Sequence, residues 1–262
     1  MILVLAGTQE GRITAELLQQ SGFMVKVSTV TGYGAELLKK QGVNNLLTGQ
    51  LDEQALIRQL RDGIELLVDA THPFAVIGSK TAIAAANEVG IPYLRLERPR
   101  ESLPQDPLVI YVESLEESLM AAHNLGKKVW FSTLGGKNMR LLYEAAKGFG
   151  ARLVVRVLPE RQSLNTCFEL DIKPSEIIAL QGPCSLEVNK ALYGQYGAEV
   201  VLTKDSGSAG GVKEKVQAAI ELGIPIIVWQ RPKITYPLMV NTPGEVLAYA
   251  KENLGGSLCK RE

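Results

Sequence analysis

The sequence is poor in the side chains that most often hold metals or cross-link a fold, with two histidines and three cysteines among 262 residues. Cys167, Cys184 and Cys259 are odd in number and form no Cys-x-x-Cys pair. We therefore predict no metal centre and free thiols in a reducing cytoplasm. Neither sign of charge predominates, because 28 Lys and Arg balance 28 Asp and Glu. That balance excludes a global basic field for nucleic acid and a polybasic membrane tail.

Long apolar runs are also absent, since no stretch approaches the ~20 residues that span a bilayer. Met1 leads directly into an apolar, strand-like run at 2–5, so no secretory signal is expected. The hydrophobic share of 46% still provides for one large core or two compact ones. We predict a folded cytoplasmic protein with a small-molecule ligand, without membrane or nucleic-acid partners. Its sequence carries no signal for an oligomeric state.

Short runs rich in Val, Ile and Leu alternate with helical patterns along the chain. Strands are predicted at 2–6, 24–30, 45–47, 66–70, 93–97, 128–132, 153–157, 177–180, 199–203 and 226–230. Helices are predicted at 12–20, 35–41, 52–61, 80–89, 138–147, 186–195 and 211–222. Strands that are apolar on both faces and separated by helices indicate α/β folding with parallel sheets covered on both sides.

A phrase of helix, glycine, Ile-Pro and strand occurs at 84–97 and again at 218–230. Duplication or convergence explains this repeat, and chance recurrence is the alternative. We predict two Rossmann-like lobes of five strands, namely a dinucleotide-binding lobe at 1–100 and a second lobe at 127–262. The connecting segment, 101–126, contains a further strand candidate at 108–112. Ligands of such sheets bind beyond the carboxyl ends of the strands, so we expect a cleft between the lobes.

The first strand runs into a glycine turn followed by a helix, which suits a diphosphate. Its candidate cofactor-binding residues are Gly7, Thr8, Glu10, Gly11 and Arg12. The dinucleotide fingerprint G-x-G-x-x-G is absent, because Gly7 and Gly11 are four apart with no third glycine following. An ordinary strand-to-helix turn is the alternative interpretation.

The second strand ends in hydroxyl side chains, Ser28, Thr29 and Thr31, rather than in an acid. Hydroxyls tolerate a ribose 2′-phosphate, so this end favours NADPH, with NADH as the alternative. After the fourth strand, Thr71, His72 and Pro73 are further candidates for cofactor contacts. His72 is also a candidate for proton transfer, or else it is simply held by hydrogen bonds within a capped turn.

A loop of small residues at 204–211 follows a strand of the second lobe. Lys204 is the first candidate for catalytic proton donor, ahead of His72 and a water. A glycine-rich turn with a solvated lysine is the alternative. Several cations fall near predicted strand ends, which suits a ligand with many carboxylates. The candidate substrate-binding residues are Lys137, Lys204, Ser206, Gly207, Arg98 and Arg231.

Taken in order, several phrases resemble the precorrin-6A reductase family of cobalamin biosynthesis. They are found at 5–12, 28–34, 69–75, 94–99, 181–185 and 203–207, with Gly210-Gly211 after them. Two departures are Cys184, where the family has an aromatic residue, and Ala6, where it has a glycine. Neither departure removes a charged or polar side chain.

This resemblance implies reduction of the C18=C19 double bond of a tetrapyrrole, precorrin-6A or its cobalt form. The family draws hydride from NADPH on the metal-free route, and NADH is assigned to cobalt-bearing intermediates. Two rival functions remain open for a two-lobed chain of this kind. One is a nucleotide-sugar transferase and the other is a dinucleotide-sensing regulator without catalysis.

Overall fold

The computed structural model describes residues 1–30 and 32–254, so the predictions on Thr31 and Cys259 lie outside the described residues. Within that range the chain separates into two compact units. Unit 1 comprises Met1–Pro99 together with the segment that begins at Pro232, and unit 2 comprises Arg100–Arg231. No helix of the described residues is long and apolar enough to cross a membrane.

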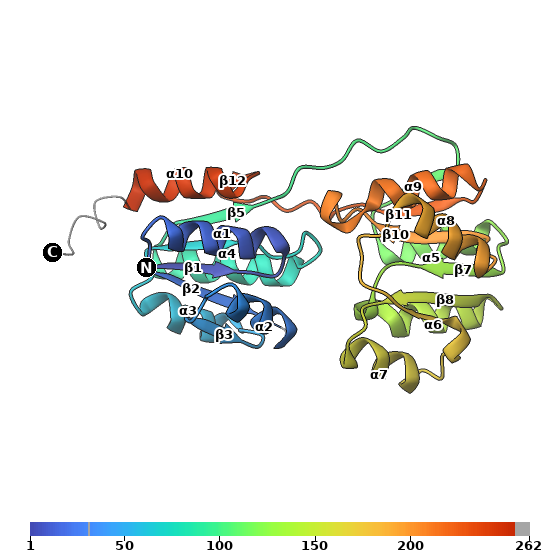
Figure 1. Ribbon diagram of the computed structural model, residues 1–262, viewed down its shortest axis with the longest axis horizontal. Helices are drawn as coiled ribbons and strands as arrows, with labels where there is room; N and C mark the ends of the chain where they lie inside the picture. Colours follow the sequence, from blue (N-terminus) through green and yellow to red (C-terminus); the bar gives the residue numbers. More distant parts are fainter. Residues whose placement is uncertain (31, 255–262) are drawn as a thin grey trace. The chain divides into compact units, whose positions relative to one another are not determined.

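Unit 1 contains a six-stranded parallel sheet in the order β12-β5-β4-β1-β2-β3. Its strands are β1 (Ile2–Leu5), β2 (Val25–Thr29), β3 (Leu46–Thr48), β4 (Leu66–Asp69), β5 (Tyr93–Leu96) and β12 (Met239–Val240). Its helices are α1 (Gln9–Gln20), α2 (Gly32–Lys40), α3 (Glu53–Arg61), α4 (Val76–Val89) and α10 (Pro243–Leu254). In Figure 1, α10 lies beside α1, with which it packs.

Unit 2 repeats this arrangement in the order β6-β11-β10-β7-β8-β9, again with every pair parallel. Its strands are β6 (Val109–Val112), β7 (Val129–Ser132), β8 (Arg152–Val157), β9 (Ile177–Ala179), β10 (Val200–Lys204) and β11 (Ile226–Trp229). Its α-helices are α5 (Leu115–Asn124), α6 (Met139–Gly148), α7 (Arg161–Glu169), α8 (Leu186–Gln195) and α9 (Val212–Glu221).

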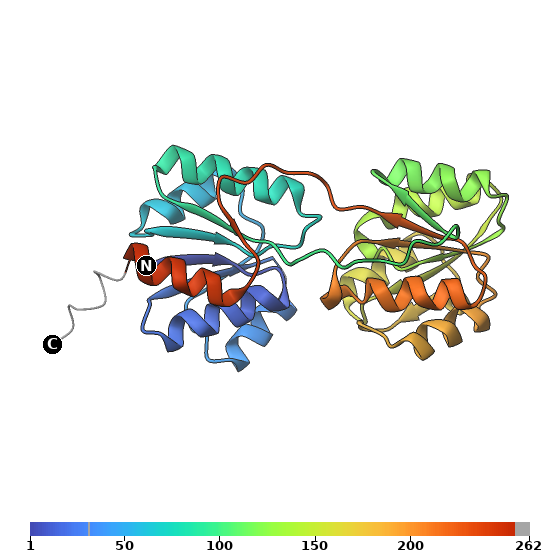
Figure 2. The ribbon, with the colours of Figure 1, turned by 90° about the horizontal axis from the view of Figure 1, so that it is seen from above.

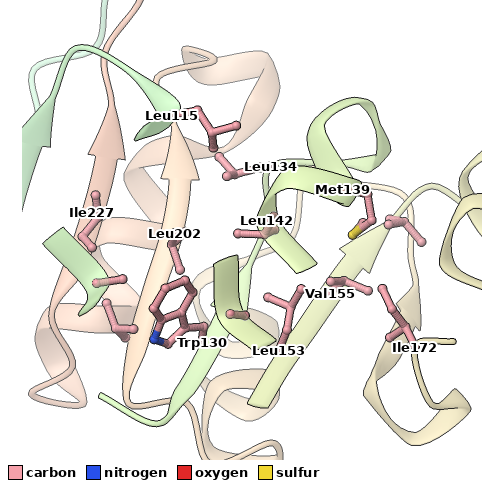
Figure 3. Packing of buried hydrophobic residues seen from close by; sticks show 14 of the residues in the cluster. Leu115, Trp130, Leu134, Met139, Leu142, Leu153, Val155, Ile172, Leu202 and Ile227 are labelled. Atoms are coloured by element: carbon pink, nitrogen blue, oxygen red, sulfur yellow. The ribbon is translucent and has the colours of Figure 1, made fainter. Parts of the chain in front are cut away.

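Each sheet has an apolar core on both faces, as the continuous hydrophobic strands predict. On one face of unit 2 the buried Trp130 of β7 packs with Leu142 of α6 and Leu202 of β10 (Figure 3). Because the cores hold the strands rigidly, the strand ends form firm supports for the loops that follow them. The predicted α/β class with two Rossmann-like lobes is confirmed.

The boundaries predicted for the lobes, 1–100, 101–126 and 127–262, differ from this division. Each sheet receives its sixth strand from a segment that crosses between the units, and both crossings can be followed in Figure 2. β6, which lies in the predicted connecting segment, pairs with β11 of unit 2. β12, assigned by prediction to the second lobe, pairs with β5 of unit 1. Sequence order misassigned these segments because pairing partners lie far apart along the chain.

Helix starts also differ from prediction where a capping group acts. α1 begins at Gln9 rather than at residue 12, because Thr8 adopts an extended conformation and caps the helix. Three helices were not predicted, namely α5, α7 and α10. They add to the cover of the two sheets without changing the layer order.

Candidate functional site

The turn after β1 lies at the carboxyl edge of the unit 1 sheet. Thr8 Oγ1 accepts a hydrogen bond from Gly11 N at 3.2 Å and donates one to Ala70 O at 3.0 Å. Gly7 is exposed, and the first amides of α1 have no intrahelical acceptor. Helix N-termini attract anions through such amides, so this turn offers the surroundings that a diphosphate needs.

Gly11 lets α1 approach the sheet closely. A Cβ atom at this position would lie 2.9 Å from Ala6 Cα and 3.0 Å from Ala70 Cβ. A glycine inside the first turn therefore serves the close helix–strand packing that the dinucleotide fingerprint assigns to its third glycine.

Replacing Gly11 with alanine is expected to destabilise the protein by about 1–3 kcal/mol, because backbone atoms must move to admit the methyl group. Gly194 of α8 is the matched control, since a Cβ there meets nothing within 4 Å. Its replacement with alanine should leave stability unchanged or slightly improved. Urea unfolding midpoints measure both, and equal effects of the two substitutions would contradict the packing role.

A small hollow in unit 1 gathers several of the predicted residues. It is lined by Thr8, Glu10, Thr71, Pro73, Arg95, Leu96 and Arg98. Arg98, predicted to hold the substrate, forms an ion pair with Glu10 at 2.8 Å (Nη2 to Oε2). This pair offsets the negative charge of the one acid in the first turn of α1, where an anion would otherwise be repelled.

The hydroxyl residues after β2 are placed less favourably than expected. Ser28 and Thr29 are buried at 7% and 5% exposure, and Val30 is 65% exposed. A ribose 2′-phosphate would therefore meet these two hydroxyls only after a local rearrangement. Their role in cofactor binding stays a prediction. Arg12 is half-buried in the first turn of α1, close in sequence to the capping residue.

The turn that follows β4 is fixed by hydrogen bonds. Asp69 Oδ1 accepts from Thr71 N at 3.0 Å and from Thr71 Oγ1 at 2.7 Å. His72 Nδ1 accepts from Phe74 N at 3.2 Å, which leaves Nε2 to carry the proton of the neutral ring. His72 is half-buried, so part of this residue remains exposed.

Sequence reasoning missed Arg95, which is fully buried in β5 and bonded to Asp69, Thr71 and Glu97. Burial alone would raise the pKa of Asp69, but Arg95 and neighbouring hydroxyls outweigh it and lower this pKa below its ordinary value. The signal was present in the sequence, because an arginine in a strand apolar on both faces needs an acid on a neighbouring strand.

Lys204 ends β10, at the carboxyl edge of the unit 2 sheet. Its Nζ donates to Leu134 O at 3.2 Å. Burial and the neighbouring charge of Lys137 lower the pKa of Lys204 to about 8. An ammonium that gives up its proton near neutral pH suits general-acid catalysis. Lys137 itself is exposed on the rim loop that follows β7.

The loop after Lys204 is closely packed. Ser206 and Gly207 are buried, and a Cβ at Gly210 would lie 1.7 Å from Ser206 Oγ. Arg231 is 5% exposed and donates through Nε to Asp205 O at 3.1 Å. Arg231, a predicted substrate-binding residue, is therefore already bonded to this loop.

Two further cations, Arg156 and Lys215, were not among the predicted site residues. They are 8% and 4% exposed. Arg156 Nη1 donates to Asn189 Oδ1 at 3.0 Å and Lys215 Nζ donates to Gly210 O at 2.7 Å. Burial, Arg156 and Lys204 lower the pKa of Lys215 to about 7. We call Arg156, Lys204 and Lys215 the cation cluster.

No carboxylate of the described residues lies within ion-pairing distance of Arg156 or Lys215. Buried charges are ordinarily paired, so this part of the rim has the electrostatics of an anion site. Lys215 had a weak sequence signal, as a lysine in the first turn of a helix that follows a glycine loop. Arg156 had none beyond its place near the end of a strand.

Known proteins resemble this chain over most of its length. The family model for "Precorrin-6x reductase CbiJ/CobK" matches residues 1–251. The cobalt-precorrin-6A reductase of Priestia megaterium is 38% identical over 249 residues, covering 94% of this chain and 96% of that protein. Its counterpart in Methanothermobacter thermautotrophicus is 40% identical over 243 residues, covering 89% and 77%.

A solved structure named CobK precorrin-6A reductase has the same fold. It superposes with a TM-score of 0.77 at 23% identity and covers 96% of each chain. The glycine turn, the Thr71 turn and the Lys204 loop all lie inside the span matched by the family model. This chain therefore belongs to the precorrin-6x reductase (CbiJ/CobK) family.

Proposed function

We propose that this protein reduces the C18=C19 double bond of precorrin-6A or cobalt-precorrin-6A, using a nicotinamide dinucleotide. The proposal rests on one observation: a capped glycine turn in unit 1 and the buried cation cluster in unit 2 both lie at carboxyl edges of parallel sheets. In a chain of this family, the first suits a dinucleotide and the second suits the acid groups of a macrocycle. The proposed setting is the cytoplasm, where the buried thiols of Cys167 and Cys184 stay reduced.

Unit 1 is proposed to hold the dinucleotide. The amides at the start of α1 suit its diphosphate, and the Thr71–His72–Pro73 turn lies beside Gly7. We favour NADPH over NADH because no acid at the end of β2 would repel a 2′-phosphate. A bound nicotinamide supplies the hydride, and the protein must supply one proton to the other carbon of the double bond.

Lys204 is proposed as the proton donor, with His72 as the second choice. Lys204 is held by Leu134 O, and with a pKa of about 8 it carries its proton at neutral pH. Arg156 and Lys215 join the predicted residues as binders of substrate carboxylates, since both cations are buried without an acid partner. Lys137, exposed on the neighbouring loop, is placed to add to the same attraction.

Anaerobic incubation of the purified protein with precorrin-6A tests the proposal. The macrocycle is supplied with and without cobalt, and NADPH or NADH is added while absorbance of the reduced nicotinamide is followed. Loss of this absorbance together with a macrocycle two hydrogens heavier is the expected result. Binding of either dinucleotide without oxidation in the presence of both macrocycles would contradict the reductase function.

Replacing Lys215 with methionine is expected to raise stability at neutral pH while weakening macrocycle binding. The unfolded chain keeps this proton up to a pKa of 10.5, whereas the folded protein releases it near 7. The free energy of unfolding of the unaltered protein therefore rises with pH across that window, and the penalty of the buried ammonium is complete below it.

The gain from Lys215→Met should accordingly be greatest at acidic to neutral pH and should fade towards alkaline pH. Urea unfolding across this range measures it, with Lys213→Met of the exposed neighbouring lysine as control. A gain that does not vary with pH, or that equals the control, would contradict the account of a buried unpaired charge.

A further inference from the structure

A buried ion network lies directly beneath the Thr71 turn. Arg95 Nη1 is 3.0 Å from Asp69 Oδ1, and Arg95 Nε and Nη2 donate to Glu97 Oε2 at 2.8 and 2.6 Å. Asp69 Oδ2 accepts a further bond from Tyr93 OH at 2.7 Å. Arg95 and Asp69 are completely buried, so neither side chain is exposed to solvent, even where Arg95 borders the hollow described above. Their function must be exerted through the residues that they hold.

Thr71 is the residue that this network holds at every polar atom. Its amide and hydroxyl donate to Asp69 Oδ1. Its hydroxyl and its carbonyl oxygen accept from Arg95 Nη1 and Nη2 at 3.0 and 3.1 Å. Thr71 in turn sets the space above Gly7, where a Cβ would lie 3.2 Å from Thr71 Cα. The network therefore fixes the turn that faces the glycine loop.

The other side of Arg95 is covered by a residue from the segment that returns to unit 1. The Tyr236 ring lies 5.1 Å from the Arg95 guanidinium carbon and stacks on Tyr93 with ring centres 6.5 Å apart. Just after Tyr236 the chain approaches β5, and Leu238 O, directly before β12, accepts from Arg95 N at 2.9 Å. A guanidinium in contact with an aromatic face is held in one plane, which aligns its fork of donors.

We propose that Arg95 and Tyr236 are positioning residues for dinucleotide binding. They hold the Thr71–His72–Pro73 turn at the distance from Gly7 that a bound dinucleotide requires, and the returning segment thereby completes the rim of unit 1. This inference rests on the proposed function, in that unit 1 is taken to bind the dinucleotide. It extends that function to two residues that act by holding the turn in place.

The test compares three variants with the full-length protein. Tyr236→Leu removes the ring, Tyr236→Phe keeps it, and Arg95→Lys keeps the charge but loses the planar fork. NADPH affinity is measured by calorimetric titration, and KM is measured separately for NADPH and for the macrocycle. Tyr236→Leu and Arg95→Lys are expected to raise the NADPH Kd and KM about five- to tenfold, with the macrocycle KM within about twofold. Tyr236→Phe should bind like the unaltered protein.

Each outcome decides the matter. A lower melting temperature with an unchanged NADPH Kd would assign Arg95 and Tyr236 a purely structural role and overturn the inference. An equal rise in both KM values would do the same. If Arg95→Lys fails to fold, the two Tyr236 variants decide, because Tyr236 is half-buried and contributes no charge to the ion network. Failure of the unaltered protein to bind any dinucleotide would instead defeat the proposed function and, with it, this inference.

Discussion

Replacing Lys204 with alanine is expected to lower kcat by about 10²- to 10⁴-fold, the usual contribution of a positioned general acid. The NADPH Kd should change by less than about threefold, because the dinucleotide is assigned to unit 1 and Lys204 belongs to unit 2. Stopped-flow reduction and direct titration of NADPH measure the two quantities separately.

Lys213→Ala is the matched control for this prediction. Lys213 lies in the first turn of α9 and is exposed. Its replacement with alanine removes the same charge without removing the proposed donor. Equal losses of kcat and NADPH affinity in Lys204→Ala would contradict the role of proton donor. So would a loss in Lys213→Ala as large as that in Lys204→Ala.

The pH dependence follows from the same residue. A general acid must carry its proton, and the pKa of Lys204 is lowered to about 8. We therefore expect kcat/KM to be level below this pH and to fall as pH rises through it. The residual activity of Lys204→Ala should lack this alkaline fall. If the alkaline fall of kcat/KM persists unchanged in Lys204→Ala, it is caused by the titration of another side chain.

Replacing Asp69 with asparagine is expected to destabilise the protein by about 3–5 kcal/mol, the usual cost of leaving one member of a buried ion pair without its partner. Asp69 and Arg95 both have 0% side-chain exposure. The neutral amide of asparagine has only one accepting oxygen, so it cannot replace the carboxylate that interacts with Arg95, Thr71 and Tyr93. Denaturant unfolding at neutral pH measures the effect.

The pair of Lys26 with the exposed Asp62 provides the comparison. Asp62 is 74% exposed and lies 3.3 Å from Lys26, so Asp62→Asn should change stability little. Because the folded pKa of Asp69 is below its ordinary value of 3.8, its contribution is present above that pH and is lost as pH falls further. The two variants should therefore differ clearly at neutral pH and converge in strong acid. Equal stability of the two at neutral pH would contradict the account.

The local sequence was sufficient to predict the alternation of strands and helices and to identify the residues that follow the strand ends. Runs such as 66–68 and 226–229 are apolar on both faces, which is typical of a parallel sheet covered on both sides. In a parallel sheet the carboxyl ends share one edge, so Thr8, Thr71 and Lys204 were correctly expected on rims. The resemblance to the family could be recognised from the sequence for the same reason, because several of the motifs that carry it lie on these loops.

Only the tertiary structure decided which strands pair and which buried charges meet. β6 and β12 pair with β11 and β5, which lie far from them in the sequence, and no local pattern encodes these pairings. Asp69 and Arg95 become neighbours through register, and Arg156 and Lys215 approach each other through packing of separate elements. Propensity and periodicity act over a few residues, whereas ion pairs, unpaired cations and shifted pKa values arise from groups that folding brings together and removes from water.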